Sequence, residues 1–250
     1  MYICLVNKYF FLLFSKRVSL ETKEKFKQVS TATIATYLYK KGLRNQYIQD
    51  VYPLKKGKEN MVGSAFTLRY IPAREDRNPI SIFQNKEHPQ RVAVESCPEG
   101  SVLVIDSRKN AKAASAGSIL ITRLMKIGAE GIVTDGGFRD SREIAELNFK
   151  SFHQKPSAPT NLTLHEAMDI NIPIGCGDVA VFPGDIIVGD DDGVMVIPLE
   201  IADEVAEDCL QMTQYENFVL EKVNNGAKVI GLYPLIDESI KKEFEEWKKK

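Results

Sequence analysis

Two short apolar runs, each followed by a helical pattern, constrain the fold of this chain most strongly. Residues 101–106 (SVLVID) follow a Pro-Glu-Gly turn, and residues 131–134 (GIVT) precede a pair of glycines. Residues 113–126 and 140–147 have the spacing and composition of helices. Strands that alternate with helices form a parallel or mixed sheet covered by helices. We therefore predict an α/β protein.

Further elements are predicted on both sides of this pattern. Residues 19–43 are helical in pattern, with Ser30 and Thr31 as capping residues and Gly42 as a stop signal. Residues 62–71 alternate and favour a strand, whereas the glycines and prolines of residues 172–198 favour short strands joined by tight turns. Additional helices are predicted at residues 80–96, 199–223 and 237–250.

The 250 residues contain no internal repeat, low-complexity segment or linker. This length suits one large domain with terminal extensions. We divide the chain into an N-terminal extension at residues 1–18, a main domain at residues 19–225 and a C-terminal loop and helix at residues 226–250.

Charge and cysteine usage exclude several classes of function. The formal net charge is −1, which gives no sign of a nucleic-acid partner. The four cysteines are scattered without a CxxC pair, and the three histidines lack HxxxH or HExxH spacing. These patterns argue against a zinc site or a disulfide scaffold and are typical of a reducing compartment. We expect a cytoplasmic protein.

The N-terminal residues 1–14 (MYICLVNKYFFLLF) are apolar and aromatic, but Lys8 interrupts them. A membrane span needs about 20 apolar residues, so this segment is too short. A signal peptide carries its basic residues first, whereas Lys16 and Arg17 follow the apolar part. We rank a non-native or mis-started extension first, then an ordered strand or arm, then a true signal, and we expect no membrane partner.

The segment 134–143 (TDGGFRDSRE) holds the most informative candidate site. It follows a predicted buried strand, and its two glycines permit a tight turn. Arg139 can bind an anion, and Asp140 and Glu143, spaced i,i+3, would share one face of a helix starting here. Ligands of open α/β folds usually bind at such strand ends. A surface ion-pair cluster at a helix start explains the same residues equally well.

Two other segments have weaker chemical signals. Residues 113–120 (AASAGSIL) place small residues before a predicted helix start, where free backbone N–H groups bind carboxylates or phosphates. A helix cap with close packing is the simpler interpretation. The Asp-rich segment 181–193 lacks the order of ligands in an EF-hand, so we interpret it as turns rather than a calcium site.

Three blocks of the sequence together resemble a known family. Residues 117–120 (GSIL), 128–143 (GAEGIVTDGGFRDSRE) and 183–198 (PGDIIVGDDDGVMVIP) occur in the order found in 4-hydroxy-4-methyl-2-oxoglutarate aldolases. The same family contains the regulator of ribonuclease activity A. The resemblance implies an α/β/β/α sandwich of the swivelling β/β/α type, with helical N- and C-terminal extensions. It also implies a ring-shaped homotrimer, sometimes stacked as a hexamer, with active sites between adjacent subunits.

The resemblance further implies a metal-dependent lyase. Such enzymes are class II pyruvate aldolases that use Mg²⁺ or Mn²⁺, and some also decarboxylate oxaloacetate. Arg139 matches the arginine that binds the pyruvyl group and stabilises the enolate, which makes Arg139 and Asp140 the expected catalytic residues. Asp140 matches the direct metal ligand, and Glu143 fits the acidic position that closes the motif, so Asp140 and Glu143 are the expected metal ligands.

The expected substrate-binding loop comprises Gly117, Ser118, Ile119 and Leu120, together with Arg139. The backbone amides of Ile119 and Leu120 match those that hold the substrate carboxylate in the family. Ser118 departs from the family pattern, which often has Asp or Glu there to hold metal-bound water. A serine can hydrogen-bond such water but adds no negative charge. A carboxylate elsewhere can compensate, and Asp135, Glu143, Asp106 and Glu75 are unranked candidates.

Two further segments are candidates for specificity. Residues 74–76 (RED) lie in a charged loop that can read the distal end of a substrate, although a solvated loop is the simpler interpretation. Residues 156–163 (PSAPTNLT) are rigid and polar and can line a cleft or a subunit contact.

The leading hypothesis is a metal-dependent lyase acting on a small 2-oxo acid, which cleaves a 4-hydroxy-2-oxo acid or decarboxylates oxaloacetate through a pyruvate enolate. One alternative is a non-catalytic binding protein of the ribonuclease-regulator type. Another is a hydratase or dehydratase acting on a sugar-acid-like substrate, because the same enolate chemistry serves such a reaction.

Overall fold

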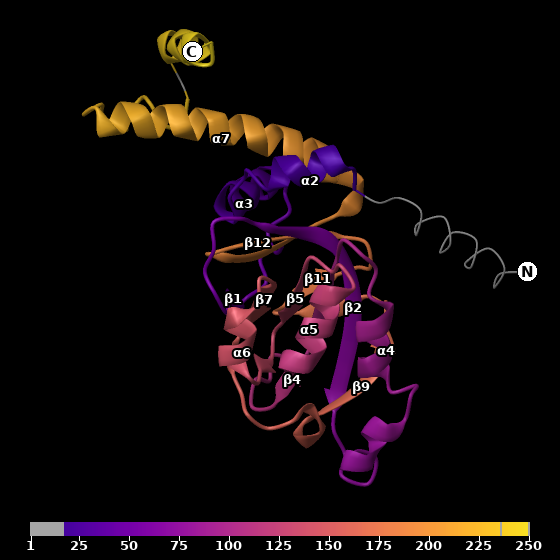
Figure 1. Ribbon diagram of the computed structural model, residues 1–250. Coiled ribbons are helices and arrows are strands. Elements are labelled where there is room, and N and C mark those ends of the chain that lie inside the picture. Colours follow the sequence, from indigo (N-terminus) through magenta and orange to yellow (C-terminus); the bar gives the residue numbers. More distant parts are fainter. Residues whose placement is uncertain (1–17, 236, 250) are drawn as a thin grey trace, which may run out of the picture.

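The computed structural model describes residues 18–235 and 237–249 (Figure 1). The interpretations of residues 1–14 therefore lie outside the described residues. Within the described ranges, no helix is both long and apolar enough to cross a membrane.

The strands alternate with helices along most of the chain, as the sequence predicts. The strands are β1 Tyr52–Pro53, β2 Met61–Pro72, β3 Ser101–Asp106, β4 Ala114–Ala116, β5 Gly131–Thr134, β6 Gly137–Phe138, β7 Lys150–His153, β8 Lys155–Pro156, β9 His165–Ile170, β10 Ile174–Cys176, β11 Val179–Val181, β12 Ile186–Asp190 and β13 Gly193–Ile197. The α-helices are α2 Leu20–Phe26, α3 Thr31–Lys40, α4 Pro89–Ser96, α5 Ser118–Lys126, α6 Ser141–Glu146, α7 Ala202–Asn224 and α8 Glu238–Trp247. Short 3-10 helices span Ile80–Gln84, Asn161–Thr163 and Leu199–Ile201.

The main sheet has eight strands in the order β1-β7-β5-β3-β2-β12-β13, with β9 also paired to β2. Strands β2, β3, β5 and β7 are mutually parallel, whereas β12 and β13 run antiparallel to their neighbours. The long β2 joins the two halves, because Ser64 is in register with both Ser101 and Ile186. The terminal strands β1 and β13 also lie close together, so the sheet nearly closes into a barrel.

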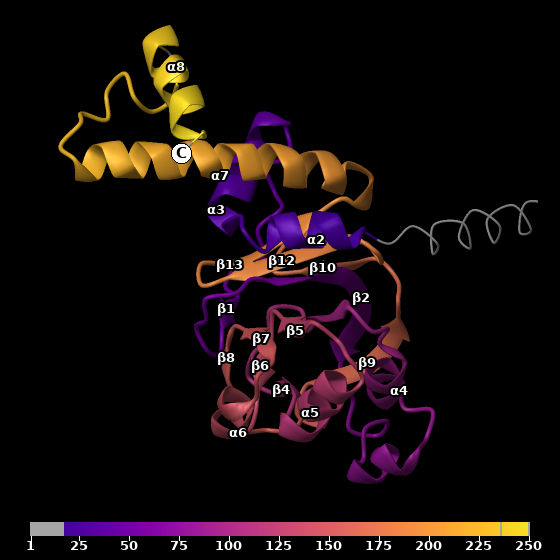
Figure 2. The same ribbon diagram turned by 45° about the horizontal axis from the view of Figure 1, so that its top comes forward.

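Alternation along the strands produces three apolar layers. Val102 and Val104 pack in the interior between the two halves of the sheet, whereas Leu103 and Ile105 pack against α4 and α5. Successive side chains of a strand point to opposite faces, so one apolar strand serves two layers. Helices α2, α3 and α7 cover the β12–β13 side, and α4, α5 and α6 lie on the opposite side (Figure 2). The α/β/β/α sandwich is therefore confirmed.

Three predicted helices differ from the observed elements. Residues 19–43 form two helices, and the second begins after Ser30, whose Oγ accepts a hydrogen bond from the Thr33 N–H at 3.1 Å. Residues 80–96 split because Pro89 starts α4 and the preceding His88 is extended. Residues 114–116 form β4 rather than the first turn of a helix, since they pair with β6.

The C-terminal part of the chain forms a helical extension. Helix α7 projects beyond the sheets, and α8 lies against it (Figures 1 and 2). The contact is aromatic: the Phe218 ring centroid lies 5.5 Å from that of Phe244 and 5.9 Å from that of Trp247. Buried aromatic pairs of this kind contribute about 0.5–1.5 kcal/mol beyond their area.

Candidate active site

Arg139 and Asp140 form a sharp corner between β6 and α6. Asp140 has a φ of 61°, in the left-handed region that few residues other than glycine adopt. Aspartate tolerates this conformation better than most side chains. The corner ends β6 abruptly and turns the Asp140 side chain back toward the start of α5, instead of along α6.

The Asp140 carboxylate joins this corner to the N-terminus of α5. Its Oδ2 accepts hydrogen bonds from the Ser118 N–H at 3.1 Å and the Ser118 Oγ at 3.2 Å. The Arg139 Nε lies 3.6 Å from the same oxygen. Ser118, where the chain departs from the family pattern, is therefore the direct partner of Asp140, whereas an acidic residue there would place a second negative charge beside it.

Gly117 permits this close approach. A Cβ added at Gly117 would lie 2.7 Å from Asp140 Oδ2 and 3.0 Å from Arg139 Cγ. Its φ of −131° is open to any residue, so the requirement for glycine is one of space rather than of backbone conformation.

The first turn of α5 presents free donors beside the corner. The Ser118 N–H is used by Asp140, and the Ile121 N–H bonds to the Gly117 carbonyl at 3.2 Å. Within the described part of the chain, the N–H groups of Ile119 and Leu120 have no acceptor. Such groups at a helix start attract anions, because the helix dipole adds to their own charge.

Gly117, Ile119, Leu120, Arg139 and Asp140 line one cavity of about 490 Å³, and Ser118 is bonded to Asp140 at its edge. The cavity is lined by α4 and the 3-10 helix before it, together with the start of the 3-10 helix Asn161–Thr163. The β4–α5 loop and the Arg139–Asp140 corner form the rest of its wall. The Arg139 side chain is 45% exposed and that of Asp140 35%, so both are accessible to a small ligand. The structure therefore brings together all the predicted loop and corner residues except Glu143.

Glu143 lies apart from the cavity. It is exposed in the first turn of α6 and is not among the residues that line the cavity. The i,i+3 argument assumed that Asp140 was helical, but Asp140 precedes the helix in a left-handed conformation. The metal-ligand role of Glu143 stays a prediction.

The other candidate carboxylates are also elsewhere. Asp135 is buried and accepts three backbone N–H bonds, from Ser107 at 2.6 Å, Lys109 at 2.9 Å and Gly177 at 3.1 Å. Burial raises its pKa despite these bonds. Its hydrogen bonds give it a structural role in joining three loops, and Asp106 likewise accepts a bond from a loop N–H, that of Arg108, at 2.8 Å.

The two predicted specificity segments have different outcomes. Glu75 is exposed and Arg74 pairs with Asp76 at 2.6 Å, so this loop does not line the cavity. Thr160 and Asn161 do line it, which confirms that the second segment borders a cleft.

Gln90 and Arg91 were missed by the sequence analysis, which assigned no chemistry to the segment that became α4. Both line the cavity. The available signal was weak: two polar residues directly after Pro89, at the start of a helix.

The expected Mg²⁺ or Mn²⁺ needs oxygen ligands from the side chains at this site. Over residues 18–235 and 237–249, no group of three or more His, Cys, Asp or Glu side chains is placed to hold a metal ion. Mg²⁺, however, commonly binds through one or two carboxylates and keeps waters or substrate oxygens as its other ligands. Asp140 Oδ1 has no hydrogen-bond partner among the described residues, so one carboxylate oxygen remains for such an ion. The residues fit a metal site that substrate completes.

The Asp-rich turn is structural, as predicted. Asp190 accepts bonds from the Thr31 N–H and Oγ1, each at 2.7 Å, and from the Asp192 N–H at 2.9 Å. Asp191 accepts the Gly57 N–H at 3.0 Å. These carboxylates are occupied in fastening α3 and a neighbouring loop to the β12–β13 turn.

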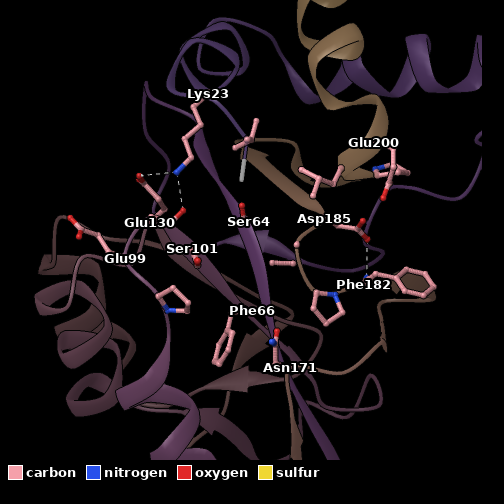
Figure 3. A pocket seen from close by; sticks show the side chains of 18 of the residues that line it. Lys23, Ser64, Phe66, Glu99, Ser101, Glu130, Asn171, Phe182, Asp185 and Glu200 are labelled. Atoms are coloured by element: carbon pink, nitrogen blue, oxygen red, sulfur yellow. Dashed lines mark hydrogen bonds and ion pairs between the residues drawn. The ribbon is translucent and has the colours of Figure 1, made fainter. Parts of the chain in front are cut away.

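A second, larger cavity of about 1020 Å³ lies between the start of β2, α2 and the β11–β12 turn (Figure 3). Two of its charged groups, Lys23 and Asp185, are bonded to neighbouring residues, whereas Glu99 and Glu200 are exposed. Lys23 donates to the Gly100 carbonyl at 2.9 Å and lies 3.9 Å from a Glu130 oxygen. Asp185 accepts the Phe182 N–H at 2.8 Å, and burial raises the pKa of Asp185 to about 6.

Comparisons with known proteins agree with this fold. A Streptomyces coelicolor structure, RraAS2, described as an unusual member of the RNase ES inhibitor RraA protein family, matches with a TM-score of 0.71 and 27% identity, over 81% of this chain and 97% of that one. An uncharacterised protein from Pseudomonas syringae has the same fold, with a TM-score of 0.73 and 21% identity over 87% of this chain and 98% of its own.

Among curated sequences, a Halalkalibacterium halodurans protein named "Putative 4-hydroxy-4-methyl-2-oxoglutarate aldolase" is 40% identical over 99 residues. That match covers 40% of this chain and 47% of the relative, so the chain spans about half the length of this curated relative. The family model described as RraA-like (Aldolase/RraA) matches residues 31–196, which include β4, α5 and the Arg139–Asp140 corner. The chain therefore belongs to the RraA-like family.

Proposed function

We propose that this protein is a divalent-metal-dependent lyase that cleaves a carbon–carbon bond of a 2-oxo acid. The substrate is a 4-hydroxy-2-oxo acid, and oxaloacetate is decarboxylated by the same site. The observation that carries the proposal is the convergence of Arg139, Asp140 and two free N–H groups on one small cavity. The aldolase name of the H. halodurans relative supports it.

The substrate carboxylate binds at the start of α5 in this proposal. The N–H groups of Ile119 and Leu120 are free there, and an anion gains from the helix dipole as well as from the hydrogen bonds. Arg139 supplies the neighbouring positive charge. Its planar guanidinium can bind the carboxylate and the 2-oxo oxygen together, which fixes the orientation of the C2–C3 bond.

Asp140 would hold Mg²⁺ or Mn²⁺ through its free oxygen, and the ion, when bound, supplies a Lewis acid beside the 2-oxo group. The Asp140 Oδ2 remains tied to Ser118, so the carboxylate is oriented before any ligand binds. Preorganised groups of this kind lower the barrier because they do not have to reorient during the reaction.

In the cleavage, the C4 hydroxyl loses its proton and C4 becomes the carbonyl carbon of the leaving product. The electron pair of the broken C3–C4 bond forms the enolate of pyruvate. Arg139 stabilises the negative charge that develops on the C2 oxygen. Protonation of C3 then gives pyruvate. Of the described residues, Asp140 is the one carboxylate that lines the cavity. The proton of the C4 hydroxyl therefore passes to a bound water or to a residue of a neighbouring subunit.

We also infer a homotrimer, or two trimers stacked as a hexamer. Two apolar side chains at the cavity are largely exposed in the single chain, Ile119 at 79% and Ile80 at 71%. Exposed apolar side chains beside a site favour a protein contact. Light scattering coupled to size-exclusion chromatography measures the mass directly.

The test of the proposed activity is pyruvate release from oxaloacetate and from 4-hydroxy-2-oxo acids, with Mg²⁺ or Mn²⁺ and with a chelator. We expect metal-dependent release that Asp140→Ala abolishes. Glu143→Gln tests the predicted second ligand, and Glu146→Gln on the same helix is its matched control. Absence of pyruvate from every substrate, with a folded oligomer confirmed, would reject the lyase.

A second candidate function is inhibition of a ribonuclease. It is favoured by the S. coelicolor relative of the RNase ES inhibitor family, which this chain matches over 97% of that structure. The purified chain would then lower the cleavage rate of an RNase E-type enzyme, and Arg139→Ala would leave that inhibition unchanged.

A further inference from the structure

One amide in the cavity wall has no partner inside the protein. Asn161 is 5% exposed, and its Nδ2 is buried with no hydrogen-bond acceptor among the described residues. Its Oδ1 accepts only a long bond of 3.3 Å from Thr160 Oγ1. Turning the amide over would leave its other end without a good partner. A buried amide of this kind destabilises the protein unless a ligand supplies the missing hydrogen-bond partner.

The position of Asn161 is fixed by its backbone rather than by its side chain. The Asn161 carbonyl accepts the Leu164 N–H at 3.0 Å, and the nearby Pro159 carbonyl accepts the Ala114 N–H at 2.9 Å. The first bond closes the 3-10 turn, and the second attaches the segment to β4, which forms another wall of the cavity. The fold therefore does not need the Asn161 amide, although it holds the amide at the cavity.

Two residues of α4 supply complementary groups in the same cavity. Gln90 uses its Nε2 to bond Tyr70 Oη at 2.9 Å and the Ser115 carbonyl at 2.8 Å, which leaves its Oε1 as an acceptor. The Arg91 guanidinium lies 4.7 Å from the centre of the Phe83 ring and forms no ion pair within the described ranges. The cavity thus holds a second positive charge and a second set of polar groups besides those of Arg139 and Asp140.

We propose that Asn161 determines specificity by donating a hydrogen bond to an oxygen of the substrate beyond C3, where Arg91 favours a negatively charged group. This inference rests on the proposed binding of the 2-oxo acid end by Arg139 and α5. A ligand with an acceptor atom beyond C3 accepts the unused hydrogen bond of Asn161 Nδ2. An apolar ligand of the same length buries the amide further and leaves it unpaired. Sites built to hydrogen-bond a group discriminate strongly against analogues that lack it.

Two ligands that the enzyme cannot cleave test the proposed contact between Asn161 and the distal group. 2-Oxoglutarate and 2-oxopentanoate have the same five-carbon chain, but the first ends in a carboxylate and the second in a methyl group. Neither has the 4-hydroxyl group or the C4 carboxylate that cleavage requires, so both can be measured at equilibrium. Calorimetry with Mg²⁺ on the full chain gives Kd for each ligand and for pyruvate, which lacks the distal group.

We expect the wild type to prefer 2-oxoglutarate to 2-oxopentanoate by about tenfold or more. Asn161→Leu should reduce this preference about tenfold while changing the Kd of pyruvate less than threefold. Asn161→Asp should weaken 2-oxoglutarate further, because it places a carboxylate opposite a carboxylate. Asn148→Asp, on the exposed loop after α6, is the matched control and should change no Kd.

Thermal unfolding separates a specificity role from a structural one. Asn161→Leu removes an unpaired buried amide, so its Tm should equal or exceed that of the wild type. An unchanged ligand preference in Asn161→Leu would overturn the inference alone, as would an equal loss of pyruvate and 2-oxoglutarate binding. Failure of the wild type to bind pyruvate would instead overturn the proposed function, and this inference with it.

Discussion

The two cavities of the protein differ in how their polar groups are used. The larger one, of about 1020 Å³, contains Lys23 and Asp185, which are bonded to neighbouring backbone groups, and the exposed carboxylates of Glu99 and Glu200. The smaller one, of about 490 Å³, contains Arg139, one free oxygen of Asp140 and two free N–H groups of α5. Volume alone would select the larger cavity, whereas the convergence of Arg139, Asp140 and two free helix N–H groups selects the smaller one.

The difference has a structural origin. The larger cavity lies where α2 and two β-turns meet. Lys23 joins α2 to the Gly100 carbonyl, and Asp185 closes its own turn by accepting the Phe182 N–H. The smaller cavity lies where β4 and β6 end side by side in parallel, so two chain reversals present their backbone and side-chain groups to the same space. Parallel strands that end together commonly create ligand sites in this way.

Removing the positively charged side chain from each cavity should give the largest difference between the two cavities. Arg139→Ala is expected to lower kcat/KM for pyruvate release by about 10²–10³-fold, because it deletes a fixed charge beside the developing enolate. Lys23→Met keeps the aliphatic stem in the larger cavity and should change kcat/KM less than threefold. Steady-state kinetics on both variants measure the contrast. Comparable losses in the two variants would contradict the assignment of the site to the smaller cavity.

The second-largest effect on activity is expected at Gly117, which leaves room for the Asp140 carboxylate. Gly117→Ala places a methyl group within 2.7 Å of Asp140 Oδ2, so the carboxylate must move. We expect kcat/KM to fall about 10–100-fold, since small misplacements of catalytic groups are costly. Gly175→Ala is the matched control, because an added Cβ there meets nothing within 4 Å. Full activity in Gly117→Ala would show that the Asp140–Ser118 contact is dispensable.

The smallest effect concerns stability in the larger cavity. Burial raises the pKa of Asp185 from 3.8 to about 6, so the native state binds this proton more tightly than the unfolded state does. The stabilisation from the protonated form is complete below pH 3.8 and is lost as pH rises through about 6. Asp185→Asn should therefore raise the free energy of unfolding at pH 7 by about 1–3 kcal/mol, with little gain near pH 4.

Urea unfolding at both pH values measures this difference, and Asp76→Asn in an exposed loop is the control. Pyruvate release should change less than threefold in Asp185→Asn. A large loss of activity would assign a catalytic role to the larger cavity.

Sequence reasoning predicted the strands and the corner better than the cavity around them. Strands β3 and β5 have the predicted bounds, because each is a continuous apolar run ended by a turn. Strand β4 was mistaken for helix, since Ala114–Ala116 has no β-forming signature and its pairing with β6 is a long-range contact. Gln90 and Arg91 acquire chemical meaning only when α4 is assembled around α5, whereas the segment that holds Asn161 was already predicted to border a cleft.

The prediction that Asp140 and Glu143 share one face of a helix was wrong for a local reason. The left-handed backbone there turns the carboxylate toward Ser118, whereas the exposed Glu143 stays on α6. Composition and spacing cannot reveal a single residue with positive φ, although the preceding pair of glycines marks the turn.

The central claim is that chemistry occurs at the Arg139–Asp140 corner. A crystal structure of the full chain with Mn²⁺ and pyruvate tests it most directly, because the anomalous signal of manganese locates the metal independently of the ligand. The account predicts manganese at Asp140, with the pyruvate carboxylate on the N–H groups of Ile119 and Leu120 and its 2-oxo oxygen near Arg139. Manganese and pyruvate bound beside Lys23 and Asp185 in the larger cavity, with the corner empty, would contradict it.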